Sequence, residues 1–230
     1  MADRLEIITI DGPSGVGKST VSRKVAAVLG YTYLDTGAMY RGVALYLLRH
    51  QVTEPSEAVK VLETLDLELL PAPDEFGDVG VRLNGEDVSG EIRTPAISML
   101  ASRVSAWPAV RQKLTELQRI LGARAKIVAE GRDTGTVVFP QAAYKFFLDA
   151  RPEERARRRI LQLQLRGEEV NEAEILALTI ERDKNDRERA IAPLCQATDA
   201  VLIDTTVIDL DEVVRRILAV VAVDQQDRRG

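Results

Sequence analysis

The sequence predicts an α/β fold in which a five-stranded parallel sheet is flanked by helices. Short, apolar, β-branched stretches alternate with longer stretches of helical character along most of the chain. This alternation is typical of parallel strands joined by helical crossovers. The 230 residues are 45% hydrophobic and 29% charged, a balance typical of a globular protein with one good-sized core.

The first strand is expected at residues 5–10, where the chain is short, β-branched and mostly apolar, as in a strand buried within a parallel sheet. It leads into a glycine-rich loop and then into a helix that should stop near Gly30. Residues 31–34 are expected to form the second strand. Asp35 or Thr36 can cap the helix that follows.

Three more strands and four more helices are expected further along the chain. The strands are predicted at residues 126–129, 144–148 and 200–203, and the helices at about 108–121, 152–166, 171–190 and 209–222. Together with the first two strands, these complete the five strands of the parallel sheet.

The segment 65–98 breaks this alternation and is interpreted as a small mixed insert on the α/β body. It contains prolines at positions 71, 73 and 95 and glycines at 77, 80, 85 and 90. Within it, residues 81–88 read as two short strands about an Asn-Gly turn, the strongest short-range hairpin signal. The alternative is an irregular surface loop.

Charge and composition exclude several classes of protein. The net charge of −5 argues against a general binder of polyanions such as nucleic acid. A single histidine, His50, disfavours a histidine metal site or a Ser/His/Asp triad. A single cysteine, Cys195, fits a reducing compartment. No apolar run approaches a membrane span, so the expected location is the cytoplasm.

The loop after the first strand carries the sharpest signal. Residues 12–19 read Gly-Pro-Ser-Gly-Val-Gly-Lys-Ser and match the spacing G-x-x-x-x-G-K-[ST]. In such a loop, backbone N–H groups and the helix N-terminus favour phosphate oxygens. Lys18 would add a charge at the β- and γ-phosphates, and the Ser19 hydroxyl could bind Mg²⁺. The alternative is a chance glycine-rich turn, which the flanking strand and helix disfavour.

Among P-loop proteins, a small-molecule kinase fits the remaining sequence best. A GTPase would need a guanine-reading segment of the Asn-Lys-x-Asp type, which the chain lacks, and motor or pump ATPases are usually larger. A kinase needs a second anion site and a way to exclude water. No strong general base stands out, but a phosphate monoester is already mostly anionic at neutral pH, so alignment and charge neutralisation would suffice.

Two segments are candidates for the second anion site. Arg41 lies one helical turn beyond Gly37, and an arginine beside a helix N-terminus can clamp a phosphate. The segment 130–136, Glu-Gly-Arg-Asp-Thr-Gly-Thr, follows a strand at its carboxyl end, where ligands of parallel sheets bind. The alternatives are an arginine extended along the surface and a polar turn with a local ion pair.

Two arginine-rich helices are candidates for a lid. Arg155, Arg158 and Arg159 share a helix face, and such like charges favour an anionic ligand that compensates them. Further on, Asp186 shares a face with two arginines, Arg182 and Arg189. It could hold both while they reach for phosphate. The alternatives are a solvated basic face and a helix with weak surface ion pairs.

Taken together, five segments resemble bacterial cytidylate kinase. They are Gly-Pro-Ser-Gly-Val-Gly-Lys-Ser-Thr, Leu-Asp-Thr-Gly-Ala-Met-Tyr-Arg, Gly-Glu-Asp-Val-Ser-Gly-Glu-Ile-Arg-Thr, Gly-Arg-Asp-Thr-Gly-Thr-Val-Val-Phe-Pro and Glu-Arg-Asp…Arg-Ala-Ile-Ala-Pro-Leu. The likeness extends from about Ile7 to Val220. The segments 85–94 and 131–140 are far more specific than the loop.

The resemblance implies a P-loop kinase core at residues 1–64 and 99–230, with a helical lid at about 152–170 and a CMP-binding insert at 65–98. It implies transfer of the γ-phosphoryl group of ATP to CMP or dCMP, in line, with Mg²⁺ and without a covalent enzyme intermediate. It also implies a cytoplasmic monomer of pyrimidine nucleotide metabolism that needs neither a nucleic acid polymer nor a membrane.

The resemblance also assigns residues to roles. The loop for ATP comprises Gly12, Pro13, Ser14, Gly15, Val16, Gly17, Lys18, Ser19 and Thr20, with Ser19 as the Mg²⁺ ligand. The CMP-binding residues would be Thr36, Arg41, Ser102, Arg111, Arg132, Asp133, Arg182, Asp186 and Arg189. The catalytic charges would be Lys18, Arg132, Arg158, Arg159, Arg182 and Arg189. Cytosine would be read by Ser102, Arg111 and Asp133.

Two positions depart from the family pattern: Thr36 stands where many members have Ser, and Glu130 where Asp is familiar. Both keep the functional group, so they bear on metal geometry or rate rather than on identity. Two alternatives stay open. One is another small-molecule P-loop kinase, acting on UMP, shikimate or a coenzyme precursor; the other is a regulatory module that binds nucleotide without turnover.

Overall fold

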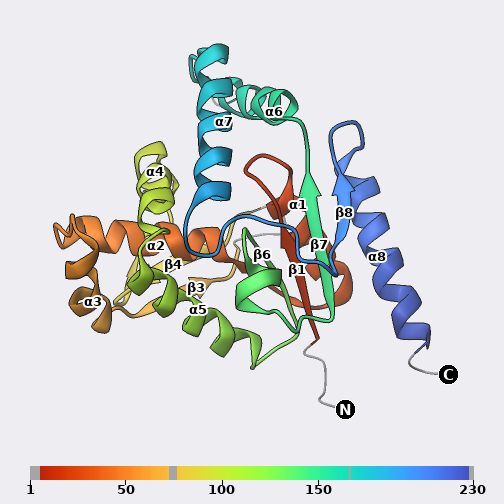
Figure 1. Ribbon diagram of the computed structural model, residues 1–230, viewed down its shortest axis with the longest axis horizontal. Coiled ribbons are helices and arrows are strands. Elements are labelled where there is room, and N and C mark those ends of the chain that lie inside the picture. The colour runs from red at the N-terminus through yellow and green to blue at the C-terminus, as the bar shows by residue number, and fades with distance from the viewer. Residues whose placement is uncertain (1–5, 73–76, 166, 228–230) are drawn as a thin grey trace. The chain divides into compact units, whose positions relative to one another are not determined.

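The structure is a computed structural model that describes residues 6–72, 77–165 and 167–227 (Figure 1). The expected strand residue Leu5, the proline at 73, and position 166 of the expected lid lie outside these residues. The chain divides into two compact units. The described residues of Met1–Leu34 and Ala125–Gly230 form the first unit, and those of Asp35–Arg124 form the second.

The first unit is built on the expected five-stranded parallel sheet, with strand order β2-β6-β1-β7-β8. The strands are β1 (Ile7–Asp11), β2 (Thr32–Asp35), β6 (Ile127–Gly131), β7 (Tyr144–Asp149) and β8 (Val201–Asp204). All five residues of β1 are buried, because this strand has β6 on one side and β7 on the other. A central parallel strand must be apolar on both faces, which accounts for its Ile-Ile-Thr-Ile sequence.

The helices of the first unit are α1 (Lys18–Leu29), α6 (Pro152–Gln164), α7 (Glu172–Glu188) and α8 (Leu210–Asp227). Apolar residues of α1 and α8, including Val21 and Ile217, form one core with residues of β1 and β7, including Ile10 and Leu148. The two remaining helices, α6 and α7, pack against each other (Figure 1).

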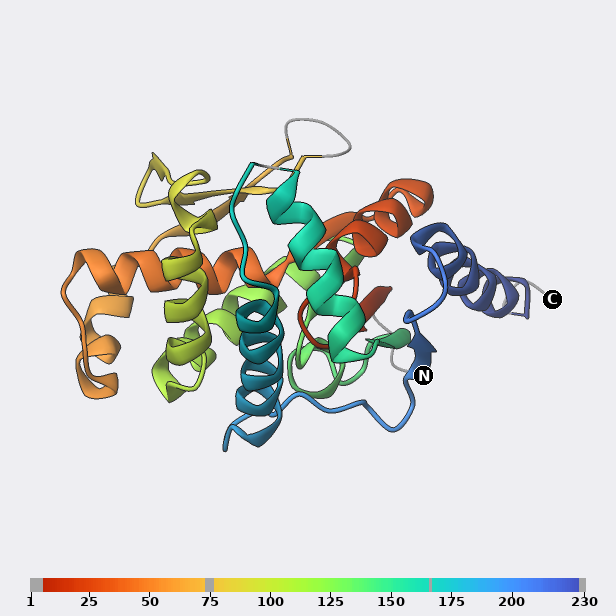
Figure 2. The same ribbon diagram turned by 90° about the horizontal axis from the view of Figure 1, so that it is seen from above.

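The second unit is a mixed α/β assembly. It contains α2 (Thr36–Arg49), α3 (Pro55–Glu63), β3 (Leu67–Leu70), β4 (Gly80–Leu83), β5 (Glu86–Asp87), the short helix η1 (Glu91–Arg93), α4 (Pro95–Val104) and α5 (Pro108–Gly122). Its three strands form a small antiparallel sheet of order β3-β4-β5. Helix α4 crosses over α2, with which it shares many contacts (Figure 2).

The expected hairpin is confirmed. Strands β4 and β5 are joined at Asn84 and Gly85, which both have positive φ angles, +46° and +87°, as a tight Asn-Gly turn requires. Strand β3 and helices α3 and α4 were not predicted. The second unit contains the whole expected insert 65–98 and extends beyond it on both sides. The role of 65–98 in binding CMP stays a prediction.

Candidate functional site

The phosphate loop connects β1 to α1 in the first unit, as the motif predicts. Gly12 has a φ angle of +150°, and a Cβ atom placed there would lie 2.0 Å from the carbonyl oxygen of Leu148 in β7. Only glycine therefore allows the chain to leave the sheet at this point. Because α1 begins at Lys18, the N-terminus of a twelve-residue helix faces the loop, a favourable arrangement for a phosphate.

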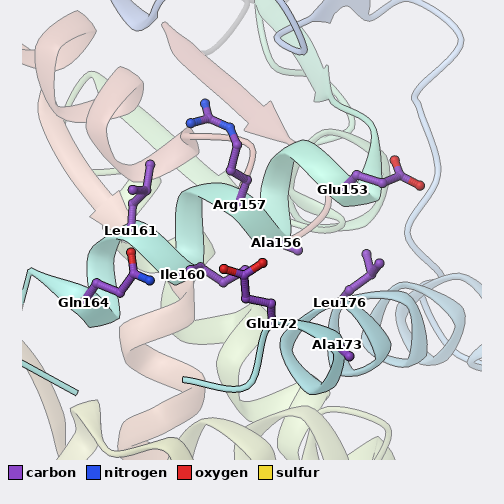
Figure 3. Close-up of a pocket in the computed structure, with 9 residues that line it drawn as sticks. All are labelled: Glu153, Ala156, Arg157, Ile160, Leu161, Gln164, Glu172, Ala173 and Leu176. Atoms are coloured by element: carbon purple, nitrogen blue, oxygen red, sulfur yellow. The ribbon is translucent and has the colours of Figure 1, made fainter. Parts of the chain in front are cut away.

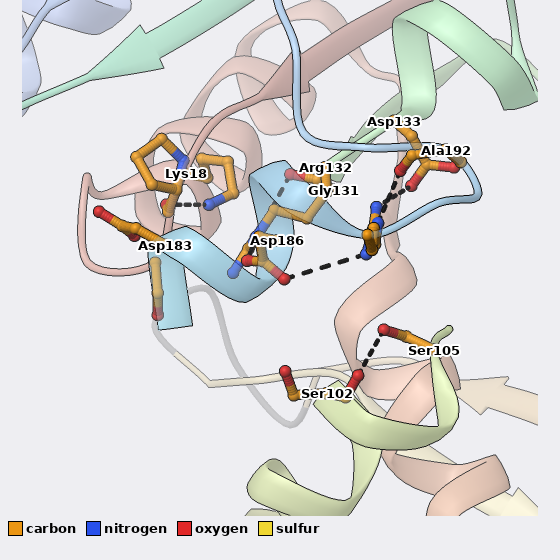
Figure 4. A network of polar contacts seen from close by, with 12 residues as sticks. Lys18, Ser102, Ser105, Gly131, Arg132, Asp133, Asp183, Asp186 and Ala192 are labelled. Carbon is orange, nitrogen blue, oxygen red and sulfur yellow. Dashed lines mark hydrogen bonds and ion pairs between the residues drawn. The ribbon is translucent and has the colours of Figure 1, made fainter. Parts of the chain in front are cut away.

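Lys18 is folded back onto its own loop. Its Nζ atom donates a hydrogen bond of 2.6 Å to the carbonyl oxygen of Pro13, and the residue is buried (Figure 4). Burial, and then the charge of Arg132, lower the pKa of Lys18 to about 7 despite three nearby carboxylates. The next residue, Ser19, is exposed and Thr20 is half-buried, so the Ser19 hydroxyl is accessible to a ligand.

A buried charge network follows the end of β6. Arg132 donates from Nε to Oδ2 of Asp186 at 2.7 Å. Asp186 is also paired with Arg189, at 3.9 Å, and Arg189 reaches Asp133 at 3.4 Å. Figure 4 shows Asp186 on α7 beside Arg132 and Asp133, which follow the end of β6. The structure thus brings together four of the residues that the resemblance assigns to CMP and catalysis.

Electrostatics keep this network charged. Burial would raise the pKa of Asp186, but the charge and hydrogen bond of Arg132 and the charges of Arg182 and Arg189 outweigh it and lower the pKa. Burial would lower the pKa of Arg132, and Asp186 and Glu130 reverse this. Of the two arginines that Asp186 was expected to hold, Arg189 forms an ion pair with it, and the contact with Arg182 stays a prediction. Arg132, which the sequence did not pair with Asp186, lies closer to it than Arg189 does, at 2.7 Å against 3.9 Å.

Two neighbouring contacts were not foreseen. The Tyr33 hydroxyl, on β2, donates a short hydrogen bond to the Glu130 carboxylate. Asp11, the last residue of β1, accepts from the Thr134 N–H at 2.9 Å, the Thr134 hydroxyl at 2.7 Å and the Gly135 N–H at 2.7 Å. These donors belong to η2 (Thr134–Val138), a single π-helical turn. Asp11 thereby ties the strand that enters the phosphate loop to the segment that carries Arg132 and Asp133.

The arginines that share one face of α6 differ in their burial. Arg158 is half-buried and donates to the carbonyl oxygen of Thr205 at 2.5 Å and to Glu154 at 3.0 Å. Arg159 is exposed. Arg155 is 2% exposed and is paired with Asp183 of α7. The basic run on α6 therefore contains one arginine committed to a buried ion pair.

Arg182 lies on α7 in the first unit, and the other remaining predicted CMP residues belong to the second unit. Asp35 caps α2 by accepting from the Ala38 N–H at 2.8 Å, and the adjacent Thr36 is 4% exposed. Arg41 folds back along the same helix and reaches Asp35 at 3.4 Å. On α5, the buried Arg111 guanidinium lies 5.7 Å from the centroid of the Tyr40 ring, within cation–π range.

Ser102 lies on α4 and is half-buried. Its carbonyl oxygen accepts a hydrogen bond of 2.7 Å from the Ser105 hydroxyl (Figure 4). This bond to the backbone does not involve the Ser102 hydroxyl. Within the second unit, Thr36, Arg41, Ser102 and Arg111 are thus placed on three helices. Their binding of CMP stays a prediction.

In the described part of the chain, no cluster of three or more His, Cys, Asp or Glu side chains is placed to hold a metal ion. None of the described helices is long and apolar enough to cross a bilayer.

A parallel sheet, a glycine-rich loop that enters a helix, and a buried lysine beside an arginine–carboxylate network define a phosphotransferase of the P-loop class. The family described as "Cytidylate kinase" matches residues 8–223. The chain belongs to the cytidylate kinase family and is a kinase that transfers a phosphoryl group to a nucleoside monophosphate.

Individual relatives agree with this assignment. A cytidylate kinase of Syntrophotalea carbinolica is 51% identical, covering 97% of this chain and 95% of that protein. A cytidylate kinase of Serratia proteamaculans is 48% identical, covering 96% of this chain and 97% of that protein. Among solved structures, an uncharacterised protein from Eubacterium ventriosum aligns with a TM-score of 0.50 at 13% identity, covering 94% of this chain and 98% of that one. This structural likeness concerns the fold alone.

Proposed function

We propose that the protein transfers the γ-phosphoryl group of ATP to CMP or dCMP, giving ADP and CDP or dCDP. The observation that carries this proposal is the buried network of Arg132, Asp186, Arg189 and Asp133, within the same unit as Lys18 and the phosphate loop. Such a network holds two guanidinium groups in place, and the carboxylates paired with them offset the cost of burying their charge.

ATP is proposed to bind at residues 12–20. The backbone N–H groups of the loop and the first turn of α1 would surround its phosphates. Lys18 would leave the Pro13 carbonyl and pair with the β- and γ-phosphates. Since the loop is held by a close approach of Gly12 to Leu148, its conformation is largely formed before the nucleotide arrives, which reduces the ordering cost of binding.

CMP is proposed to contact residues of both units. Thr36, Arg41 and Arg132 suit its phosphate, because hydroxyl and guanidinium groups are strong donors to phosphate oxygens. For the base, an Asp133 carboxylate can accept from the exocyclic amine of cytosine, and Arg111 and Ser102 can donate to its acceptors. UMP lacks that amine and would leave the Asp133 carboxylate without a hydrogen-bond donor, so we expect the enzyme to discriminate strongly against UMP.

The residues at the loop suit a hard divalent cation. Ser19 is exposed at the second position of α1, and the carboxylates of Glu130 and Asp11 are near enough to raise the pKa of Lys18. We propose Ser19 as the protein ligand of Mg²⁺. When bound, Mg²⁺ would neutralise phosphate charge and polarise the phosphoryl group that is transferred.

The chain's own residues would align the reactants and neutralise charge. Lys18, Arg132, Arg158, Arg159, Arg182 and Arg189 are the proposed catalytic charges. No residue needs to act as nucleophile or general base, because the acceptor phosphate of CMP is largely anionic at neutral pH. Direct in-line transfer then requires orientation and electrostatic stabilisation of the equatorial oxygens. We also propose that the enzyme acts in the cytoplasm as a monomer.

The test is ADP production from ATP and Mg²⁺ with CMP, dCMP, UMP, AMP, GMP or shikimate offered separately. We expect turnover on CMP and dCMP and weak turnover on UMP. In the Asp133→Asn variant, kcat/KM for CMP should fall by about tenfold to a hundredfold and the preference for CMP over UMP should narrow. ATP affinity should be unchanged. Equal turnover on UMP in the wild type would contradict the proposed acceptor.

A further inference from the structure

Arg155 is the most buried arginine of the α6 basic run. Its side chain is 1% exposed, whereas its neighbours Arg157 and Arg159 are exposed on the same helix. A guanidinium carries five N–H donors and is removed from water only at high cost unless they are satisfied. The hydrogen-bond acceptors of Arg155 therefore indicate the role of this buried side chain.

Those partners come from three separate segments. Nε donates to the carbonyl oxygen of Ala150, just after β7, at 2.9 Å. Nη1 donates to Oδ1 of Asp183 on α7 at 2.9 Å and to the carbonyl oxygen of Ser14 in the phosphate loop at 3.1 Å. Nη2 donates to the second carboxylate oxygen of Asp183. Asp183 is itself 5% exposed, so the pair is buried on both sides.

The phosphate loop also packs directly on Arg155. Gly15 has a φ angle of +81°, and a Cβ atom at this position would lie 3.1 Å from Cβ of Arg155. A side chain at position 15 would therefore be both conformationally strained and tightly packed. The loop backbone at Gly15 packs against α6 at Arg155. The hydrogen bond from Arg155 to the Ser14 carbonyl oxygen fixes how the loop is aligned with the helix.

The bond to the Ser14 carbonyl has a geometric consequence. In a planar trans peptide, the C=O and N–H groups point in opposite directions. By holding the Ser14 carbonyl oxygen, Arg155 orients the peptide between residues 14 and 15 so that the Gly15 N–H points away from α6. Within a phosphate-binding loop, the N–H groups are the groups that contact the phosphate oxygens.

We propose that Arg155 and Asp183 are positioning residues that hold the Ser14–Gly15 peptide ready for the nucleotide phosphates and tie its orientation to the α6–α7 pair. This inference rests on the proposed binding of ATP at residues 12–20. Arg155 contacts no phosphate in this role; it acts through the loop backbone. A buried ion pair is weak support for stability in itself, which favours a positioning role over a purely structural one.

The packing between α6 and α7 is consistent with this. Away from the ion pair, the two helices border an open pocket of about 350 Å³ lined by residues that include Ile160, Leu161 and Leu176 (Figure 3). The Arg155–Asp183 pair adds a buried polar tie to the packing between the two helices.

The test uses the double variant Arg155→Met, Asp183→Leu, which replaces the ion pair with apolar side chains of similar size. Replacing both partners avoids leaving an unpaired buried charge, so the protein should fold and melt near the wild-type temperature. We expect Kd for MgADP, measured by calorimetry, to rise about tenfold. We expect KM for ATP to rise while KM for CMP stays unchanged. The matched control is Arg157→Met, an exposed arginine on the same helix, which should leave all these values unchanged.

A folded double variant with wild-type affinity for MgADP would overturn the inference. If the double variant does not fold, Arg155→Lys decides, because it keeps the buried charge but cannot bridge Asp183 and Ser14 at once. A Kd for MgADP equal to the wild-type value in Arg155→Lys would reject the positioning role, and a raised Kd would support it. Failure of the proposed function would give a different result, because the wild-type protein itself would then fail to bind MgADP or to phosphorylate CMP.

Discussion

Lys18 is the proposed phosphate-binding cation of the loop, and its pKa is strongly lowered. Burial and the charge of Arg132 lower its pKa to about 7. Phosphate oxygens favour the ammonium form, so a bound nucleotide raises this pKa. Above pH 7 the empty loop holds mostly neutral Lys18, and the nucleotide-bound loop holds the charged form. Binding above pH 7 must therefore take up a proton, and affinity must weaken as pH rises.

Calorimetry with MgADP in two buffers of different ionisation enthalpy measures this uptake. Near pH 8 we expect a proton uptake approaching one per nucleotide, and near pH 6 an uptake close to zero for this group, because Lys18 is then charged in both states. Affinity should fall by up to about tenfold per pH unit above pH 7. The Lys18→Arg variant, which stays charged, should lose the uptake at pH 8. An uptake that persists in this variant would assign the proton to another group.

The candidate site illustrates what a sequence reveals at the scale of single residues. Lys18 and the loop were predicted because their spacing is local and their chemistry specific. Arg132, Asp186 and Arg189 were predicted as site residues, but the dominant pairing of Asp186 with Arg132 was not. These two residues are 54 positions apart, and no local pattern encodes such a contact. The burial of Arg155 was missed for the same reason, since its partner Asp183 is 28 positions away.

At the scale of elements, the π-helical turn η2 is held to the sheet through Asp11. The carboxylate accepts three hydrogen bonds from Thr134 and Gly135, and Asp11 is 4% exposed. Thr134→Val keeps the shape of the side chain and removes one donor from a buried carboxylate. We expect it to lower the free energy of unfolding by about 1–3 kcal/mol. Urea denaturation of this variant measures the change.

Thr134→Ser is the matched control, because it keeps the hydroxyl and loses only a methyl group. We expect its free energy of unfolding to stay within about 1 kcal/mol of the wild-type value. Equal losses in the two variants would show that the methyl group, rather than the hydrogen bond to Asp11, stabilises η2. Because η2 follows Arg132 and Asp133 directly, Thr134→Val should also raise KM for CMP more than KM for ATP.

All five strands of the parallel sheet were predictable, because each is a short apolar run next to a clear turn or helix signal. The second unit was harder to predict. Helix α4 begins at a Thr94 cap followed by Pro95, and α3 begins with Pro55 and a capping box between Glu54 and Glu57. These are local start signals, but the helices that follow them have only nine and ten residues, and neither was predicted. Strand β3 is only four residues long and half-exposed. Its extended conformation therefore depends on pairing with β4, which is not visible in the local sequence.

At the scale of the whole molecule, the residues proposed for ATP fall within one compact unit, and those proposed for CMP are divided between two. Every residue proposed for ATP lies in the first unit, whereas Thr36, Arg41, Ser102 and Arg111 lie in the second. The sequence predicted an insert at 65–98, and the compact second unit is larger, spanning Asp35–Arg124. Helices α2 and α5 therefore share its core, since α2 packs on β4 and α5 on α3.

This division gives a prediction for hydrogen exchange. MgADP should slow exchange at amides of the phosphate loop and the start of α1, but not at amides of α2, α4 and α5. CMP should slow exchange in both units, because its proposed contacts include Arg132 and Asp133 in the first and Arg41 and Arg111 in the second. At a ligand concentration of about 100 Kd, mass action contributes about 2.7 kcal/mol. Amides that exchange only from ligand-free molecules should then slow by up to about a hundredfold.

The control is the Arg41→Ala variant, which removes a proposed phosphate contact of CMP from the second unit without altering the phosphate loop. Protection by MgADP should be unchanged in this variant. Protection by CMP should weaken in both units together, because one ligand provides it in each. If CMP protected only the first unit of the wild type, the residues proposed on α2, α4 and α5 would not bind CMP. The specificity for cytosine would then have to arise from Asp133 and its neighbours within the first unit.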